Sequence, residues 1–193
     1  HATDRPDGGT GAETMTGGVD NDTYVVDNAG DIVIELRNQG NDRVESTISY
    51  DLPANLERLF LMGPHHLVGR GNALDNKLFG NAGKNFLNGG GGDDVIDGGA
   101  GSDRIYGSEG NDLLIGGGGN DKFHFNTALG PGNVDRIIDY APGQDTLYLA
   151  RYAFAGVGPH GTLGAGAFVQ GSSAGDASDR IVYDSATGNI FYD

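Results

Sequence analysis

The chain has 193 residues with 36 glycines and no cysteine, and its 27 acidic and 12 basic side chains give a formal net charge of −15. The length indicates one domain or two short ones. The charge excludes a protein that follows a phosphate backbone, the lack of cysteine excludes disulfides and cysteine-bound zinc, and no apolar run approaches the roughly 18 residues of a membrane span.

The front of the chain holds two nine-residue units. Residues 1–7 carry no apolar signal segment, and we expect them to be a linker or an artificial remnant in front of a piece of a longer protein. The units GGTGAETMT (8–16) and GGVDNDTYV (17–25) follow, each with glycine at position 1 and an acid, Glu13 or Asp22, at position 6.

Residues 26–70 are less regular. Four segments, 28–35, 39–47, 49–61 and 62–69, each combine turn residues with an alternating apolar pattern, which is typical of a turn followed by a strand. We therefore predict short strands here that are separated by longer turns than those of the nine-residue units.

Residues 71–124 repeat every nine residues without a slip. Four units between 89 and 124 read GGGGDDVID, GGAGSDRIY, GSEGNDLLI and GGGGNDKFH, with glycine at positions 1 and 4, aspartate at 6 and an apolar residue at 8. The two units before them, GNALDNKLF (71–79) and GNAGKNFLN (80–88), carry Asn76 and Asn85 at position 6. We expect the position-8 side chains to point inward and form an apolar ladder.

Each unit combines a short strand with a turn of about six residues. Such a strand is not stable alone, and the glycines allow positive φ and leave the backbone carbonyls bare. Calcium takes roughly six to eight oxygens from carboxylates and carbonyls in a tolerant geometry. A glycine-rich turn that ends in aspartate supplies both kinds of oxygen, so two stacked turns can complete one calcium site.

In a roll, successive turns alternate between two sides, so turns i and i+2 stack. The position-6 residues then form two rows, one of Asn76, Asp94 and Asp112 and one of Asn85, Asp103 and Asp121. We expect calcium between the stacked aspartates, and weaker or empty sites at the asparagines, which lack the charge. Some glycines are expected to supply carbonyl ligands or to allow the turn: Gly89, Gly91, Gly98, Gly101, Gly107, Gly110, Gly116 and Gly119.

The same stacking extends to the front of the chain. Asp22 and Asp42 are candidates for one pair of facing turns, and Glu13 and Asp31 for another. We therefore predict one continuous solenoid, with an irregular part over 8–70 and regular repeats over 71–124. The alternative is two separate rolls joined by a small β insert.

The nonapeptide pattern G-G-x-G-x-D-x-U-x resembles the RTX, or haemolysin-type, calcium-binding repeats, most closely over 8–25 and 71–124. The resemblance implies an all-β protein, a right-handed parallel β-roll that binds several Ca²⁺ ions. It also implies a bacterial protein that the type I secretion machinery exports, and hence an extracellular location.

Residues 125–193 leave the repeat and are predicted to form a C-terminal β cap, which a solenoid needs over its last apolar rung. The segment 134–150 reads as a strand, a turn through Pro142 and Gly143, and a second strand, and it resembles the segment that follows the last repeat in serralysin-type proteins. That resemblance implies that Asp139 and Asp145 complete calcium shells. Residues 180–193 read as a hairpin.

These patterns favour a non-catalytic module of a larger exported protein that folds on binding calcium outside the cell, most simply as a monomer. The sequence GSSAG around Ser173 lacks the strand-then-helix context of a nucleophile elbow, so we do not expect an enzyme. The alternative is a calcium-dependent polysaccharide- or cell-surface-binding module attached to an extracellular enzyme. An aromatic-lined groove would favour that alternative, and the densest aromatic set comprises Tyr140, Tyr148, Tyr152 and Phe154.

Overall fold

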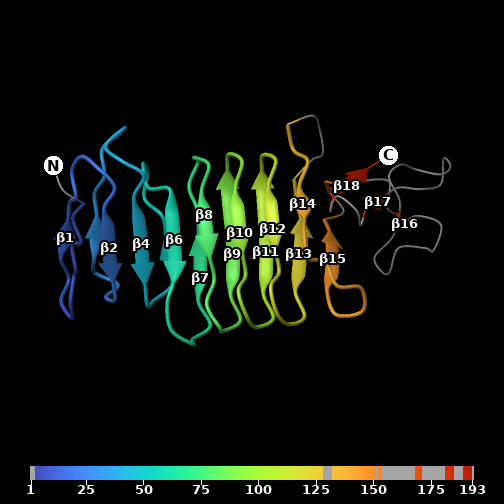
Figure 1. Cartoon of the computed structure of the whole chain (residues 1–193), viewed down its shortest axis with the longest axis horizontal. Helices are drawn as coiled ribbons and strands as arrows, with labels where there is room; N and C mark the ends of the chain where they lie inside the picture. Colours follow the sequence, from blue (N-terminus) through green and yellow to red (C-terminus); the bar gives the residue numbers. More distant parts are fainter. Residues whose placement is uncertain are drawn as a thin grey trace.

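The computed structural model describes residues 3–127, 132–150 and 152–153, together with three further strands within 168–192. The molecule is elongated, and its strands stack side by side along the long axis from the N-terminus at one end to the C-terminus at the other (Figure 1). All regular elements of the described residues are strands. In these parts of the chain, there is no helix with the length and apolarity needed to cross a membrane.

The strands form three sheets. The largest has ten strands in the order β16 (Phe168–Gln170), β17 (Ile181–Asp184), β18 (Asn189–Tyr192), β14 (Arg136–Ile137), β12 (Leu113–Ile115), β10 (Val95–Asp97), β8 (Lys77–Phe79), β6 (Arg58–Leu61), β4 (Arg43–Ser46) and β2 (Thr23–Val26). The second has six strands in the order β15 (Thr146–Leu149), β13 (Lys122–Phe125), β11 (Arg104–Glu109), β9 (Phe86–Gly91), β7 (Val68–Arg70) and β5 (Tyr50–Asp51). The third pairs β1 (Thr14–Met15) with β3 (Ile32–Val33).

Consecutive strands of the repeat alternate between the two large sheets, and all strand pairs from β2 to β15 are parallel. Val95 pairs with Leu113, and Arg104 pairs with Lys122, so a strand meets the strand two nonapeptide units further on. Strands this short are stabilised because each interior strand is hydrogen-bonded on both edges. The predicted parallel β-roll is therefore confirmed.

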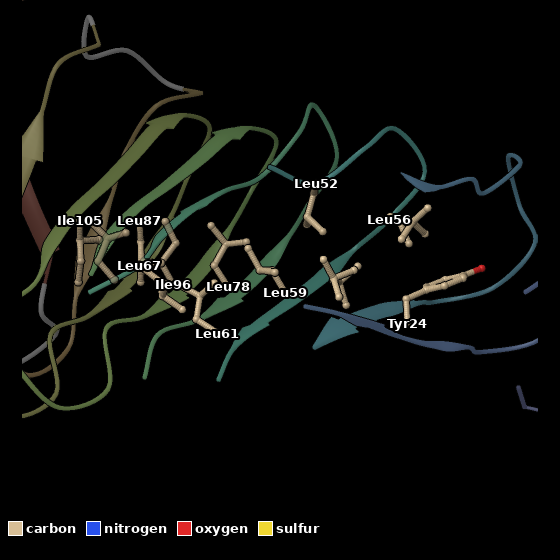
Figure 2. Packing of buried hydrophobic residues seen from close by; sticks show 14 of the residues in the cluster. Tyr24, Leu52, Leu56, Leu59, Leu61, Leu67, Leu78, Leu87, Ile96 and Ile105 are labelled. Carbon is tan, nitrogen blue, oxygen red and sulfur yellow. The ribbon is translucent and has the colours of Figure 1, made fainter. Parts of the chain in front are cut away.

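The core is a ladder of position-8 side chains between the two sheets. Ile96, Ile105, Leu114 and Phe123 are fully buried, as are the corresponding Leu78 and Leu87 of the asparagine units. Figure 2 shows Leu78, Leu87, Ile96 and Ile105 following one another along the interior of the roll. The alternation of a buried residue between two partly exposed ones within β10 and β12 explains why only one side chain per strand enters the core.

The irregular part over 26–70 belongs to the same solenoid. The ten-stranded sheet runs without a break from β2 through β6 and β8 into the regular repeats, which is the continuous arrangement predicted and not two rolls joined by an insert. The opposite side is interrupted, because β3 pairs with β1 in a separate sheet, whereas β5 begins the six-stranded sheet.

The roll extends past residue 124. Leu113 pairs with Arg136 and Lys122 pairs with Thr146, so β14 and β15 continue the two parallel sheets and do not pair with each other. Further on, β17 and β18 are antiparallel, as predicted for 180–193, and β18 joins the edge of β14. Ser173 and Phe154 lie outside the described residues.

Candidate calcium site

The position-6 carboxylates lie at the starts of the strands, where the turns stack in two rows. The backbone N–H of Asp94 donates to Oδ1 of Asp112 at 2.8 Å, and the N–H of Asp103 donates to Oδ1 of Asp121 at 2.8 Å, both across eighteen residues. The same bond links each position-6 asparagine to the aspartate of the next turn in its row. The structure thus brings together the side chains that the sequence places in each row.

The row aspartates keep their second oxygen free of any protein partner. Among the described residues, the Oδ2 atoms of five aspartates are buried and accept no hydrogen bond: Asp22, Asp94, Asp103, Asp112 and Asp121. These five residues are only 1 to 2% exposed. A buried carboxylate oxygen without a partner is strongly unfavourable, so these turns fit a cation taken up from solution.

The free oxygens face a space that glycine keeps open. A Cβ atom at Gly89 would overlap Oδ2 of Asp94 and would lie 2.8 Å from the carbonyl oxygen of Gly107 in the next turn of the row. At Gly98, a Cβ atom would lie 2.6 Å from the free oxygen of its own turn and 2.7 Å from the next turn's glycine carbonyl. Carboxylate and carbonyl oxygens therefore line one small space, which is the ligand chemistry that calcium prefers.

Glycine is also required by the backbone of the turn. Positions 2 and 4 of the four regular units have positive φ, for example +106° at Gly90 and +97° at Gly92, and Ser108 adopts φ +82° at position 2. Gly101, Gly110 and Gly119, predicted to allow the turn, occupy position 4 and have positive φ. Gly91, predicted either to supply a carbonyl ligand or to allow the turn, does not have positive φ, whereas Gly92 beside it does.

Burial raises the pKa of the row carboxyls. At Asp94, loss of solvent is the main cause and nearby aspartates add to it, so that the pKa rises to about 8 despite the hydrogen bond from Asn76. Burial likewise raises the pKa of Asp103 to about 7, and those of Asp112 and Asp121 are raised for the same reason. Without a cation, these side chains favour the protonated form more than ordinary carboxyls do.

The asparagine turns are closed by their own side chains. Oδ1 of Asn76 accepts the N–H of Asn72 at 2.7 Å, and Nδ2 of Asn76 donates to the carbonyl of Leu56 at 3.1 Å. Asn85 is held in a similar way by Asn81. An amide donor therefore stands where the aspartate turns have a free oxygen, and the expectation of weak or empty sites here remains a prediction.

At the front of the roll, Asp22 and Asp42 face each other as expected. The N–H of Asp22 donates to Oδ1 of Asp42 at 2.7 Å, and the N–H of Asp42 donates in turn to Oε2 of Glu57 at 2.8 Å. Glu57 extends this row, although no nine-residue period marks it.

The pair of Glu13 and Asp31 differs from the aspartate rows. The N–H of Glu13 donates to Oδ1 of Asp31 at 3.3 Å, so the two turns are stacked. Oδ2 of Asp31 already accepts the N–H groups of Asp27 and Asn28, and Glu13 is exposed. This pair has no free buried oxygen of the kind that marks the other turns.

At the far end of the regular block, Asp145 follows Asp121 in its row, because the N–H of Asp121 donates to Oδ1 of Asp145 at 2.9 Å. The other row continues with Asp135, which accepts the N–H of Asp112 at 3.2 Å and was not predicted. Asp139, which was predicted to complete a calcium shell, accepts the N–H groups of Gly116 at 2.9 Å and Gly117 at 2.7 Å, one on each oxygen.

A second feature covers the outer face of the six-stranded sheet. Tyr106, His124 and Tyr148 stack in sequence at 4.4 and 4.6 Å between ring centroids, and Phe86 lies 5.0 Å beyond Tyr106. Burial, aided by Arg104 and Lys122, lowers the pKa of His124 to about 4. The stack shares only Tyr148 with the aromatic set predicted from the sequence. Of the other described members of that set, Tyr140 packs against the core and Tyr152 is exposed.

Positively charged side chains accompany this stack despite the acidic composition. Arg70 lies 5.5 Å from the centroid of the Phe86 ring, and Lys122 lies 5.8 Å from that of Tyr148. A pocket beside the stack is lined by charged, polar and apolar residues, among them the basic Lys84, Arg104 and Lys122 and the acidic Asp103. The outer face of this sheet therefore combines flat rings with hydrogen-bond donors and positive charge.

Comparison with known families identifies the RTX calcium-binding nonapeptide repeat in four copies, over residues 7–24, 70–105 and 97–126. The matched segments contain the four regular aspartate turns and the first two units at the front of the chain. A search among curated proteins finds no match to this chain.

Proposed function

Since this chain carries RTX repeats and is thereby a calcium-binding module, we propose that it is a non-catalytic part of a larger exported protein that folds when it meets calcium outside the cell. The observation that carries the proposal is the set of buried aspartate oxygens without a protein partner. RTX repeat proteins are typically secreted, and the proposal assigns export by the type I machinery to the protein of which this chain is a part.

The proposed switch follows from the balance of charge and burial. In the absence of calcium, the row aspartates must either keep an unpaired buried charge or take up a proton, and both weaken the fold near neutral pH. A ligand that binds only the folded state adds RT ln(1 + [L]/Kd), or about 1.4 kcal/mol per site at ten times the dissociation constant. Several such sites together are comparable with a domain stability of roughly 5–15 kcal/mol.

The bound calcium would supply positive charge to the row carboxylates and complete their coordination. Asp94 and Asp112 would hold it in one row, and Asp103 and Asp121 in the other, together with turn carbonyls such as that of Gly107. Low cytosolic calcium would then leave the chain unfolded and able to pass a narrow exporter, and extracellular calcium would fold it.

The test is far-UV circular dichroism of the chain during a calcium titration followed by a chelator. The proposal predicts a reversible, cooperative gain of β signal. The variant D112N should raise the calcium concentration at the midpoint, whereas D93N, the same change at an exposed neighbouring-turn aspartate, should leave it unchanged. A β spectrum that no chelator alters would contradict the switch.

A panel of esterase and protease substrates tests the non-catalytic part of the proposal. Turnover that the S173A variant abolishes would contradict it, because Ser173 is the one serine in a nucleophile-elbow sequence. Absence of turnover under calcium saturation is the predicted result.

A second candidate function is the binding of an acidic polysaccharide, which the stack on the six-stranded sheet favours. Sugar rings pack on flat aromatic faces, and Arg104 and Lys122 provide partners for uronate carboxylates. The variants Y106A and R104A should then weaken retention on an immobilised polyuronate in calcium. The control F60A removes a ring from the Phe60–Phe79 stack on the opposite sheet and should have no effect. Equal retention of Y106A, R104A and wild type would reject this candidate.

A further inference from the structure

Three buried carboxylates meet where the ten-stranded sheet begins. Asp22 precedes β2, Asp42 precedes β4 and Glu35 follows β3, and oxygen atoms of the three side chains lie within 4.8 Å of one another. Asp22 and Asp42 are 1% exposed and Glu35 is 5% exposed. Unlike the two aspartates, Glu35 has no place in the nonapeptide pattern.

The spacing of the acids explains how Glu35 reaches this point. Asp22 and Asp31 are one nonapeptide apart, but Asp31 and Asp42 are separated by two residues more than the repeat allows. The two additional residues extend the chain after β3. There, buried and exposed side chains alternate: Val33 and Glu35 are buried, whereas Ile34 and Leu36 are exposed. Glu35 therefore continues the inward face of β3 and reaches the start of the aspartate row.

The side chain of Glu35 is held in place from both oxygens. The hydroxyl of the fully buried Tyr24 donates to Oε1, and the N–H of Leu36 donates to Oε2 at 3.2 Å. The Tyr24 oxygen in turn accepts the N–H of Gly17 at 2.6 Å. Each Glu35 oxygen keeps a lone pair that these bonds do not use.

The site also contains an atom that lacks any protein partner. Oδ1 of Asp22 accepts the N–H of Asp4 at 2.7 Å, but Oδ2 is buried and accepts no hydrogen bond from the described residues. A Cβ atom at Gly17 would overlap this Oδ2 and would lie 2.5 Å from the Tyr24 oxygen. In the regular turns, the corresponding neighbour is a glycine carbonyl of the next turn, so the surroundings of this free oxygen are different.

Protein cations do not neutralise the three carboxylates. The ion pairs found among the described residues join Arg5, Arg43 and Arg70 to other acids, namely Asp7, Glu45 and Asp51. The cluster therefore gathers three buried carboxylates that no ion pair among the described residues balances.

We propose that Asp22, Glu35 and Asp42 form a separate site for a hard divalent cation, which calcium would fill at lower concentration than the nonapeptide sites. A regular site has carboxylates from two stacked turns, whereas this one has three, and affinity for calcium rises with the number of charged ligands and the rigidity of the site. The inference goes beyond the proposed function, because its third ligand lies outside the repeat and its sequence pattern.

The experiment counts the calcium bound per chain by equilibrium dialysis and elemental analysis over a range of free calcium. The variant E35Q should bind one ion fewer, and the missing ion should be the one taken up at the lowest free calcium. The control E45Q makes the same change on the outer face of β4, where Glu45 pairs with Arg5 and Arg43, and should bind as many ions as wild type. An unchanged first ion in E35Q would overturn the inference.

A regular-site variant separates this inference from the proposed function. D112N should lose calcium only at higher free concentrations and keep the first ion. If E35Q matches wild type while D112N binds less, the additional site is wrong and the calcium role of the repeats stands. If neither the wild type nor any variant binds calcium, both the additional site and the proposed function are wrong.

Terbium, a trivalent stand-in for calcium, gives a second measurement that does not depend on the folding of E35Q. Emission excited through tyrosine requires a ring close to the ion, and Tyr24 is bonded directly to a proposed ligand. The first equivalent of terbium should give strong emission in wild type and in the control Y106F, and weak emission in Y24F. Equal emission from Y24F and wild type would contradict the site.

Discussion

The asparagine turns over 71–88 and the aspartate turns over 89–124 share a backbone register but differ at one atom of the position-6 side chain. In the first, the amide nitrogen of Asn76 donates to a carbonyl, and the turn is complete within the protein. In the second, the corresponding oxygen of Asp94 is buried without a partner. The comparison teaches that the exchange of an amide for a carboxylate decides whether a turn is closed by the chain or needs a cation.

The backbone differs along with the side chain. In the aspartate turns, positions 2 and 4 have positive φ and hold glycine except at Ser108, whereas Asn72 and Gly83 at these positions of the asparagine turns do not have positive φ. Asn72 instead uses its side chain to hold the loop, with Nδ2 donating to Pro53 at 2.7 Å and to Leu56 at 2.8 Å. The asparagine turns are therefore held by side-chain hydrogen bonds within the protein and lack the positive-φ backbone of the aspartate turns.

Replacing calcium by magnesium should have the largest effect, because it acts on every aspartate turn and not on the asparagine turns. Magnesium demands a small, regular shell of about six ligands and gives up its water reluctantly, which a wide carbonyl-rich site does not satisfy. We expect no gain of β signal with magnesium alone in far-UV circular dichroism. Full folding in magnesium would show that charge alone, and not the shape of the shell, decides between the two kinds of turn.

The double variant D94N/D112N should have the next largest effect. It gives one row the amides of the asparagine turns without the side-chain oxygen that Asn81 offers to the amide of Asn85, since the matching position holds Gly90 or Ser108. Loss of about two calcium sites should lower the free energy of unfolding by about 3 kcal/mol when the free calcium concentration is about ten times the dissociation constant of a site. Urea unfolding in calcium measures this loss.

D75N/D93N serves as the matched control for that double variant, because both aspartates are exposed at position 5 of the same row. It should unfold as the wild type does. An equal loss of stability in the two double variants would mean that total charge, and not the row geometry, determines calcium binding.

The variant N76D should replace the amide donor that holds this turn by a carboxylate oxygen without a protein partner. A Cβ atom at Gly71 would overlap both the Asn76 oxygen and the Gly89 carbonyl, so the oxygens needed for a site are already close. We expect one more calcium per chain, and a stability in chelator that falls by about 1–3 kcal/mol because a buried carboxylate replaces a bonded amide. Calcium counting with N120D, the same change at an exposed residue, provides the control.

A further prediction concerns pH in the presence of a chelator. The folded-state pKa values of Asp94 and Asp103 lie at about 8 and 7, above the ordinary value of 3.8. When the pKa of a carboxyl is higher in the folded chain than in the unfolded one, its protonated form stabilises the fold. This contribution is fully present below the unfolded-state pKa and is lost as the pH rises through the folded-state pKa. The chelated chain should therefore be more stable at about pH 5 than at about pH 9 in urea unfolding, and the opposite order would contradict the burial of these carboxyls.

The periodic part of the fold follows directly from the sequence. A strict nine-residue step with one apolar residue per strand predicts both the alternation between two sheets and the eighteen-residue register, and the buried Ile96 and Leu114 confirm it. The rows of aspartates follow from the same register. The closed state of the asparagine turns could have been anticipated from Asn72 and Asn81, which replace glycine at position 2.

Features outside the period could not be read in the same way. Asp135 joins its row across 23 residues and Asp145 across 24, because the intervening loops have lengths that no repeat specifies. Glu35 enters the first row through two additional residues, whose position within 26–70 the sequence does not mark. The stack of Tyr106 and His124 does follow the eighteen-residue step, and the shared register could have revealed it.

The most direct test of the central claim is a crystal structure in calcium in which anomalous scattering locates the ions. We expect ions beside the free oxygens of the aspartate rows, between Asp94 and Asp112 and between Asp103 and Asp121. We expect none at Asn76 or Asn85, where amide donors hold the turn. Ions at the asparagine turns, or none beside the aspartates, would contradict the claim.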